Sequence, residues 1–302
     1  MLWVLPNRQK QLELLPSLAR LGGKVAMHRI IAGVISTTLL SCTFGLAGDQ
    51  AKNGDKDPSH PPFKVLNGSR ANPNITLTEL LDSYEKAVGG KEAIEKIRTL
   101  VAYEERRAEA KLGEQRYGSS VAYFKFPNKS KSVLTLPGGS KGVIGYDGKI
   151  AWYDSPSEGI QRVPSEENAF AAQELNLFNR LHLREVFPQM KLVGSSKVEG
   201  RDVYAVYSSV GRSYRDLYFD AETRLLILSV EVQLGVGRTL MTVEAYSDFR
   251  VVNGVKFPFA VKGIEFNHEN SYEIIRTRIE CNIPLGDDFF SVNATTAKEG
   301  GS

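Results

Sequence analysis

The feature that most constrains this chain is a long succession of short alternating segments separated by turn residues. Between residues 99 and 282, apolar and polar side chains alternate, or short apolar runs occur, with Gly, Asp or Asn between them. A period of two is typical of β-strands that bury one face. The segments predicted as strands are 99–112, 117–126, 130–136, 142–146, 149–154, 159–163, 190–198, 201–209, 213–220, 224–234, 237–250, 255–267 and 270–282. Such strands, joined by short turns, indicate a large antiparallel meander.

Helix signals are few and lie mainly before the strands. Thr76 and Glu79 form a capping-box pattern ahead of apolar residues at helical spacing, which predicts a helix that ends at Gly89-Gly90. A shorter helix is expected over 91–97. An internal helix is expected over about 165–185, with Ser165 as its cap. No Gly-rich loop follows a strand in a βαβ rhythm, so a Rossmann-type fold is excluded.

Composition narrows the function classes. The 302 residues carry 38 Lys and Arg against 35 Asp and Glu, a net charge of +3. This balance does not indicate a nucleic-acid-binding protein. The only cysteines are Cys42 and Cys281, which excludes a disulfide framework and any Cys-rich metal site.

The N-terminus reads as a targeting segment. Residues 30–40 (IIAGVISTTLL) are uncharged and follow Arg29. A run of about 11 residues is too short to span a bilayer and has the length of a signal-peptide core. It ends in Leu39-Leu40-Ser41-Cys42, which resembles the lipobox of bacterial lipoproteins. We therefore expect a signal peptide over 27–41 and a lipidated Cys42 at the mature N-terminus.

Alternatives to this N-terminus remain open. An ordinary secretory signal could be cut after Ala47, or the apolar run could stay as an uncleaved anchor. Residues 1–26 contain two prolines and an acid ahead of Met27, so they are interpreted as an extension before the true start, with a long n-region as the alternative.

Residues 42–75 are expected to be a disordered tether, because they are rich in Gly, Pro and charged residues. The folded domain is predicted over 76–290, and a disordered tail over 291–302. Thr43, rather than Asp, after the cysteine favours an outer-membrane lipoprotein that faces the periplasm, with a soluble periplasmic or secreted protein as the alternative.

Several motifs together resemble one family. They are, in order, 81–93 (LDSYEKAVGGKEA), 145–149 (GYDGK) with Trp152, 217–220 (LYFD) before Leu225, 246–250 (YSDFR) with 253–258 (NGVKFP), and 282–285 (NIPL) with Asp288 and Phe289. This order is similar to that of lipoprotein-sorting (LolA/LolB-like) periplasmic proteins, and it covers about 76–290.

The resemblance implies a mainly β (α+β) fold. We expect an open, strongly curved antiparallel half-barrel, with the N-terminal helices and the internal helix covering its concave face. It also implies an apolar ligand, such as acyl chains or lipoprotein lipid, in the concavity. The same superfamily includes sensors that bind lipidic or protein ligands, so a sensory or protein-docking module is the alternative.

The sequence contains only poor matches to catalytic and metal-binding motifs. Residues 138–142 (GGSKG) match the pattern of a hydrolase nucleophile elbow around Ser140, but strands are predicted on both sides where the elbow needs a helix. A serine hydrolase is kept only as a remote alternative. His60, His182 and His268 lack metal-ligand spacing, and Asp287-Asp288 reads as a polar turn. No catalytic residue, metal or cofactor is predicted, and the protein is not expected to be an enzyme.

The apolar faces of three successive strands carry the ligand hypothesis. Leu226, Leu228, Val230 and Val232 alternate along one strand, and the polar residues Arg215, Glu231, Gln233 and Glu244 are assigned to the opposite faces. Ordinary core packing is the alternative. The predicted ligand-cavity residues are Phe170, Leu177, Phe178, Leu181, Leu217, Phe219, Leu226, Leu228, Val230, Met241 and Val243.

Overall fold

A computed structural model describes residues 73–110, 113–135, 138–163, 177–187, 189–210, 213–234, 239–265 and 270–292. The predicted signal peptide, Cys42, most of the tether and nearly all of the tail lie outside these residues, as do His60, Phe170 and His268. Among the described helices, none is long and apolar enough to cross a membrane.

The described strands form one antiparallel sheet in the order β6-β5-β4-β3-β2-β1-β13-β12-β11-β10-β9-β8-β7. Each segment that alternation predicted as a strand overlaps one of these strands. Their bounds are Thr99–Ala110 (β1), Gly113–Lys125 (β2), Lys129–Thr135 (β3), Lys141–Tyr146 (β4), Ala151–Ser155 (β5), Gly159–Arg162 (β6), Lys191–Val198 (β7), Arg201–Val210 (β8), Ser213–Asp220 (β9), Leu226–Leu234 (β10), Thr239–Val252 (β11), Val255–Glu265 (β12) and Asn270–Cys281 (β13). The mainly β, open and curved fold is confirmed.

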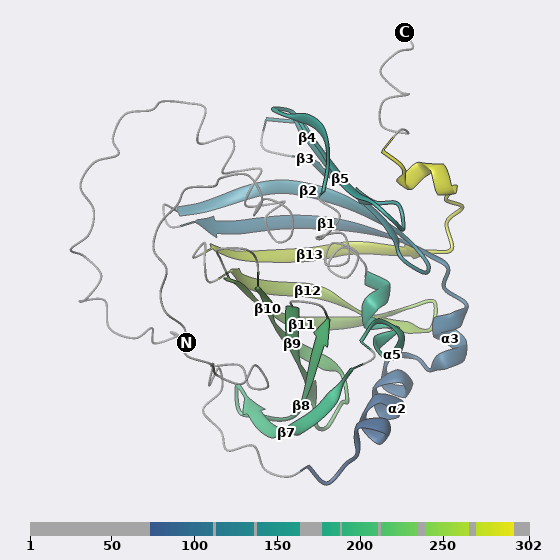
Figure 1. Ribbon diagram of the computed structural model, residues 1–302, viewed down its shortest axis with the longest axis vertical. Coiled ribbons are helices and arrows are strands. Elements are labelled where there is room, and N and C mark those ends of the chain that lie inside the picture. Colours follow the sequence, from purple (N-terminus) through teal and green to yellow (C-terminus); the bar gives the residue numbers. More distant parts are fainter. Residues whose placement is uncertain are drawn as a thin grey trace, which may run out of the picture.

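The sheet is strongly curved and does not close (Figure 1). Strands that are neighbours in the sheet are consecutive in the chain except at the centre, where β1 pairs with β13. The strands β6 and β7 therefore lie at opposite edges, although they are consecutive in the chain. The connection between them has to pass from one edge to the other, and its described part packs on the concave side with α2 and α3.

The N-terminal helices are α2 (Leu77–Val88) and α3 (Lys91–Glu95). The predicted capping box is present, because the Thr76 side chain accepts from the Glu79 amide and the Glu79 carboxylate accepts from the Thr76 amide. Leu80, Leu81 and Tyr84 turn the apolar face of α2 into the core, and the Tyr84 ring meets the Phe219 ring edge-on at 5.2 Å. Helices and sheet thus share one core.

The internal helix differs from the prediction. Residues 164–176 lie outside the described residues, and the rest forms a 3-10 helix, η3 (Leu177–Arg180), and a short helix, α5 (Leu183–Val186). A continuous helix through 185 is therefore wrong. At about 100° per residue, it would point Leu183 away from Leu177 and Leu181. The break at His182 lets all of these leucines reach the core.

A β-bulge corrects the predicted faces of β10. Leu226 lies opposite Phe219, but the next pair is Leu228 with Tyr218, so the register shifts between Leu226 and Leu228. An extra residue in one strand inverts the side on which the following side chains project. The prediction that Leu226 shares a face with Leu228, Val230 and Val232 is therefore wrong.

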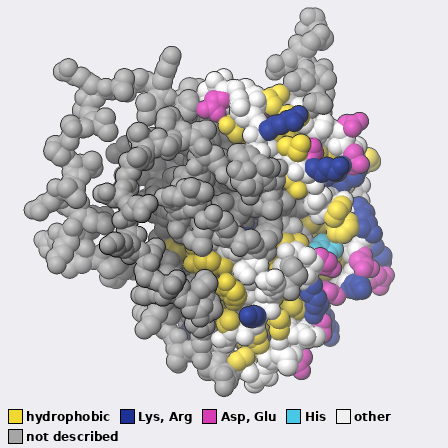
Figure 2. Space-filling view, viewed as in Figure 1, with side chains coloured by type: hydrophobic (Ala, Val, Ile, Leu, Met, Phe, Trp, Pro, Cys, Tyr) yellow, Lys and Arg dark blue, Asp and Glu magenta, His cyan; other side chains and the backbone are white. Residues whose placement is uncertain are grey.

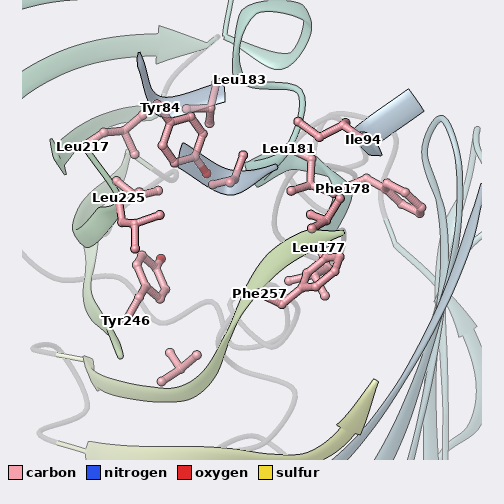
Figure 3. Close-up of a cluster of buried hydrophobic side chains, with 14 of the residues drawn as sticks. Tyr84, Ile94, Leu177, Phe178, Leu181, Leu183, Leu217, Leu225, Tyr246 and Phe257 are labelled. Atoms are coloured by element: carbon pink, nitrogen blue, oxygen red, sulfur yellow. The ribbon is translucent and has the colours of Figure 1, made fainter. Parts of the chain in front are cut away.

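Two apolar clusters result, one on each face of the sheet. The larger cluster lies on the concave side and joins α2, α3, η3 and α5 to the sheet; Figure 3 shows Tyr84, Leu181, Leu217 and Phe257 pointing toward one another within it. The smaller cluster lies on the opposite face and contains Val198, Val203, Ala205, Tyr218, Leu228, Val230, Val232 and Met241.

The segment after β13 packs on the outer face of β2–β5. It includes the 3-10 helix η4 (Asp287–Phe290), whose Phe290 is fully buried. The Trp152 indole donates to the Phe290 carbonyl at 3.0 Å, and the Lys131 ammonium donates to the Phe289 carbonyl at 3.2 Å. The Trp152 ring lies directly over Gly145, where a Cβ atom would come within 2.6 Å of the ring.

Gly145→Ala should therefore destabilise the protein by about 1–3 kcal/mol, because the added methyl group overlaps the buried Trp152 ring. Gly142→Ala on the same strand is the matched control, since its nearest contact would be an ordinary 3.8 Å from the Asp154 carbonyl. Urea unfolding of both variants measures the difference. Equal free energies of unfolding for the two variants would show that the position of the Trp152 ring does not depend on a glycine at residue 145.

Candidate functional site

The predicted ligand-cavity residues do not form one surface. Leu177, Phe178, Leu181, Leu217, Phe219 and Leu226 belong to the concave core. The bulge in β10 places Leu228, Val230, Met241 and Val243 on the opposite face. Phe170 lies outside the described residues. The concave members are buried side chains of one apolar cluster.

A cavity of about 340 Å³ lies where the helical elements meet, between α2, α3 and the segment that contains η3 and α5. We call it the helix cavity. Its volume is at the lower end of the range of about 300–1,000 Å³ that is usual for small-molecule sites. Its apolar wall comes from α2, α3, the start of β1, the end of β2 and the connecting segment; the residues are Leu81, Ile94, Ile97, Phe126, Leu181 and Leu183.

His182 lines the helix cavity at the break between η3 and α5. Its ring lies 4.8 Å from the Phe126 ring, centroid to centroid, and its Nε2 atom is buried without a hydrogen-bond partner. Burial lowers the pKa of His182 below its ordinary value. The imidazole is therefore neutral at pH 7 and leaves a polar atom available at an otherwise apolar wall.

Charged side chains surround the mouth of the helix cavity, and Figure 2 shows both signs mixed along this edge of the molecule. Arg184 pairs with Asp82 at 2.6 Å and with Glu85 at 3.6 Å. Lys91 lies 3.8 Å from Glu95. The rim therefore combines paired charges with an apolar interior.

The concave face changes character beyond the apolar core. On β1, Glu104 is buried and accepts hydrogen bonds from Arg106 at 2.9 Å, Ser120 at 2.8 Å and Arg276 at 3.2 Å. Arg276, on β13, also donates to the Pro258 carbonyl at 2.7 Å. Burial acts to raise the pKa of Glu104, but the two guanidinium groups outweigh it and hold the pKa below its ordinary value.

A second, half-buried carboxylate follows on β11. Glu244 accepts from Arg180 at 3.1 Å, from the Tyr246 hydroxyl at 2.7 Å and from the Tyr272 hydroxyl at 2.8 Å. The Tyr272 ring reaches Glu244 by lying across Gly263, where a Cβ atom would come within 2.0 Å of the ring. Only glycine leaves room for this ring to cross β12.

Arg215 and Glu231 complete this buried polar network, as an ion pair between β9 and β10. The sequence analysis assigned Arg215, Glu231 and Glu244 to the faces opposite the apolar residues. The prediction is right for Glu231 and Glu244, which lie on the face opposite Val230 and Val243. It is wrong for Arg215, which lies on the same face of β9 as Leu217. The face that carries Glu244 is the concave one, because Leu217 lies opposite Ser229, and Ser229 lies opposite Glu244. The signal that sequence reasoning missed is the position of the bulge, after which the polar residues of β10 face inward.

Other candidate motifs are explained by structure. The loop around Ser140 leads from β3 to β4, so the strand-turn-helix of a nucleophile elbow is not formed there. Asp287 lies in η4 and pairs with Lys125 at 2.7 Å and Lys129 at 3.2 Å, which holds the C-terminal segment. Burial raises the pKa of the Cys281 thiol to about 11. Within the described residues, no group of His, Cys, Asp and Glu could hold a metal ion.

A double-mutant cycle tests the buried polar network. Glu104→Gln should cost about 3–5 kcal/mol, because it leaves the Arg276 guanidinium buried without its carboxylate. The double variant with Arg276→Met should cost clearly less than the sum of the single changes. Chemical denaturation measures all three.

Asp202→Asn, at the exposed Lys197–Asp202 pair on β7 and β8, is the control and should cost less than about 1 kcal/mol. Additive costs for Glu104 and Arg276 would contradict a coupled network.

Comparison with known proteins supports the fold. No family model and no curated protein matches the sequence. Among solved structures, a LolA superfamily protein from Nitrosomonas europaea is 15% identical, covering 73% of this chain and 99% of its own, with a TM-score of 0.55. A DUF1329 family protein from Desulfovibrio piger is 14% identical, covering 71% and 98%, with a TM-score of 0.53.

A domain from Vibrio parahaemolyticus, described as an outer membrane lipoprotein-sorting protein, is 10% identical, covering 72% of this chain and 96% of its own, with a TM-score of 0.50. At such low identities the likeness shows the fold alone. The resemblance seen in the sequence motifs is thus confirmed at the level of structure, and the chain has the fold of LolA superfamily proteins.

Proposed function

We propose that this protein binds an apolar, chain-like ligand in the cell envelope and that part of the ligand enters the helix cavity. The observation that carries the proposal is the cavity itself. It holds about 340 Å³ beside the apolar core of the concave face, and its inner wall is apolar. The apolar inner wall favours contact with hydrocarbon, because burying apolar surface is favourable.

The position of the helix cavity supports binding by small movements. Two of its walls are the short helices α3 and α5. Short helices gain most of their stability from packing, so they can shift to admit a chain. The fold shared with a domain described as lipoprotein-sorting is consistent with such a ligand.

A cavity-filling variant tests ligand binding. Leu183→Phe adds volume at the cavity wall, so it should reduce binding of the neutral apolar fluorophore N-phenyl-1-naphthylamine by about tenfold or more while leaving the fold intact. Val251→Phe is the control, because Val251 is 62% exposed and does not line the cavity. Fluorescence titration and thermal unfolding are measured together.

The absence of fluorophore binding by the wild-type protein would overturn the proposal and favour the protein-docking alternative. Equal binding by wild type and Leu183→Phe would place the ligand elsewhere than in the helix cavity.

We propose further that Cys42 anchors the protein by lipid to the outer membrane, facing the periplasm. The support is the lipobox-like Leu39-Leu40-Ser41-Cys42 after an uncharged run. Several acyl chains on one residue hold a protein on a membrane, whereas a single chain binds only marginally.

Cys42→Ala should therefore move the protein from the membrane fraction to the soluble periplasmic fraction, or leave it unprocessed. Cys281→Ala is the matched control and should stay in the membrane fraction. Intact-mass spectrometry of the mature N-terminus reads out the lipid. A wild-type protein that begins at Gly48 without lipid would establish ordinary secretion.

A further inference from the structure

We infer that the ligand of the helix cavity is a single-chain amphiphile with an anionic head group, which pairs with Arg98 at the mouth of the cavity. This inference rests on the proposed function and names the class of ligand for the same site. It starts from which cationic side chains around the cavity mouth form ion pairs with carboxylates and which does not.

Arg98 differs from the other cations of the rim. Arg184 and Lys91 each lie within ion-pair distance of a carboxylate. Within the part of the chain that the structure describes, the Arg98 guanidinium has no carboxylate partner. Its guanidinium carbon instead lies 5.2 Å from the centre of the Phe126 ring. Arg98 therefore presents hydrogen-bond donors beside an apolar wall without an anion to receive them.

The position of Arg98 is set by the backbone rather than by an ion pair. Its backbone amide donates to the Asn282 side chain at 2.8 Å, and the next residue, Thr99, begins β1. Phe126 lies just after β2, and its backbone amide donates to the Arg98 carbonyl at 2.9 Å. Two hydrogen bonds thus fix Arg98 and Phe126 at the same edge of the cavity.

His182 provides an independent observation at the same place. Its ring lies 4.8 Å from the Phe126 ring, centroid to centroid, and its buried Nε2 atom has no hydrogen-bond partner. Nε2 is therefore available to form a hydrogen bond with a polar group of a ligand in the cavity. Arg98 and His182 line the same cavity, so a head group bound at Arg98 would share the cavity with His182.

Size and charge select the ligand class. A volume at the lower end of the usual range fits one hydrocarbon chain better than several. Guanidinium groups bind carboxylate and phosphate in a bidentate manner. The acidic side chain nearest to His182 is Glu185, at 3.8 Å, and it is 71% exposed, so solvent screens its repulsion of an anion.

The experiment compares chains that differ only in their heads. Palmitate, hexadecanol and hexadecyltrimethylammonium are each used to displace N-phenyl-1-naphthylamine from the full mature protein, below their micelle-forming concentrations. Palmitate should bind about tenfold or more tightly than hexadecanol, and the cation should bind most weakly. Arg98→Gln should abolish the advantage of palmitate without changing hexadecanol binding.

Lys91→Gln is the matched control, because it removes the same charge from the same rim at a residue that already has a partner. It should change palmitate binding less than about twofold. Arg98→Lys should restore part of the palmitate advantage, which a purely structural role for Arg98 would not predict. Palmitoyl phosphate distinguishes a phosphate head from a carboxylate head.

The outcomes separate the two proposals. If none of the chains displaces the fluorophore, ligand binding by the helix cavity is wrong. If palmitate and hexadecanol bind equally, or if Arg98→Gln and Lys91→Gln have equal effects, the cavity binds chains but Arg98 does not select their head group. Tighter binding of the cation would reverse the inferred charge of the ligand.

Discussion

The structure depends on one constraint, which is that a wide sheet that curves but does not close has a concave face to be covered. The two edges, β6 and β7, are joined by consecutive residues of the chain, so the connection has to pass across the sheet. Its described part supplies Leu177, Phe178 and Leu181 to the core, and α2 fills the adjoining space with Leu80 and Tyr84. The helix cavity is the space that remains where these covering elements meet.

The far part of the concave face is covered in a different way. Instead of apolar side chains, it carries Glu104 and Glu244, each surrounded by several donors. Buried carboxylates are stable only when their charge and hydrogen bonds are satisfied, and both meet this condition within the sheet. The network therefore links strands that are distant in sequence. It also separates an apolar, helix-covered region from a polar one within the same concavity.

Much of this fold can be predicted from sequence, because its local signals agree. The capping box at Thr76, the turn at Asp147-Gly148 and the alternation of the strands each specify an element without tertiary information. The resemblance of the motifs adds the curved, open form of the sheet. These predictions succeed because each depends on a few neighbouring residues.

The candidate site could not be predicted in the same way. A single bulge after Leu226 decides whether Leu228 or Glu231 faces the helices, and alternation alone does not reveal it. Likewise, the helix breaks at His182, and this break allows Leu183 to pack in the core. No pattern in the neighbouring sequence predicts the break. In the sequence, Arg98 belongs to no motif that would mark it as a binding residue. Its role as a candidate ligand-binding residue follows only from the structure. There it lies beside Phe126 and His182, and the neighbouring cations are paired with carboxylates.

The pairing of β1 with β13 has a consequence for the order in which the molecule can assemble. The half of the sheet from β1 to β6 and the half from β7 to β13 meet along this one ladder. Because the chain is synthesised from its N-terminus, the two halves cannot pair until β13, the last strand, has been synthesised. Contacts between such distant residues also form slowly, because a long loop must close first. The β1–β13 ladder therefore forms only after nearly the whole domain has been synthesised.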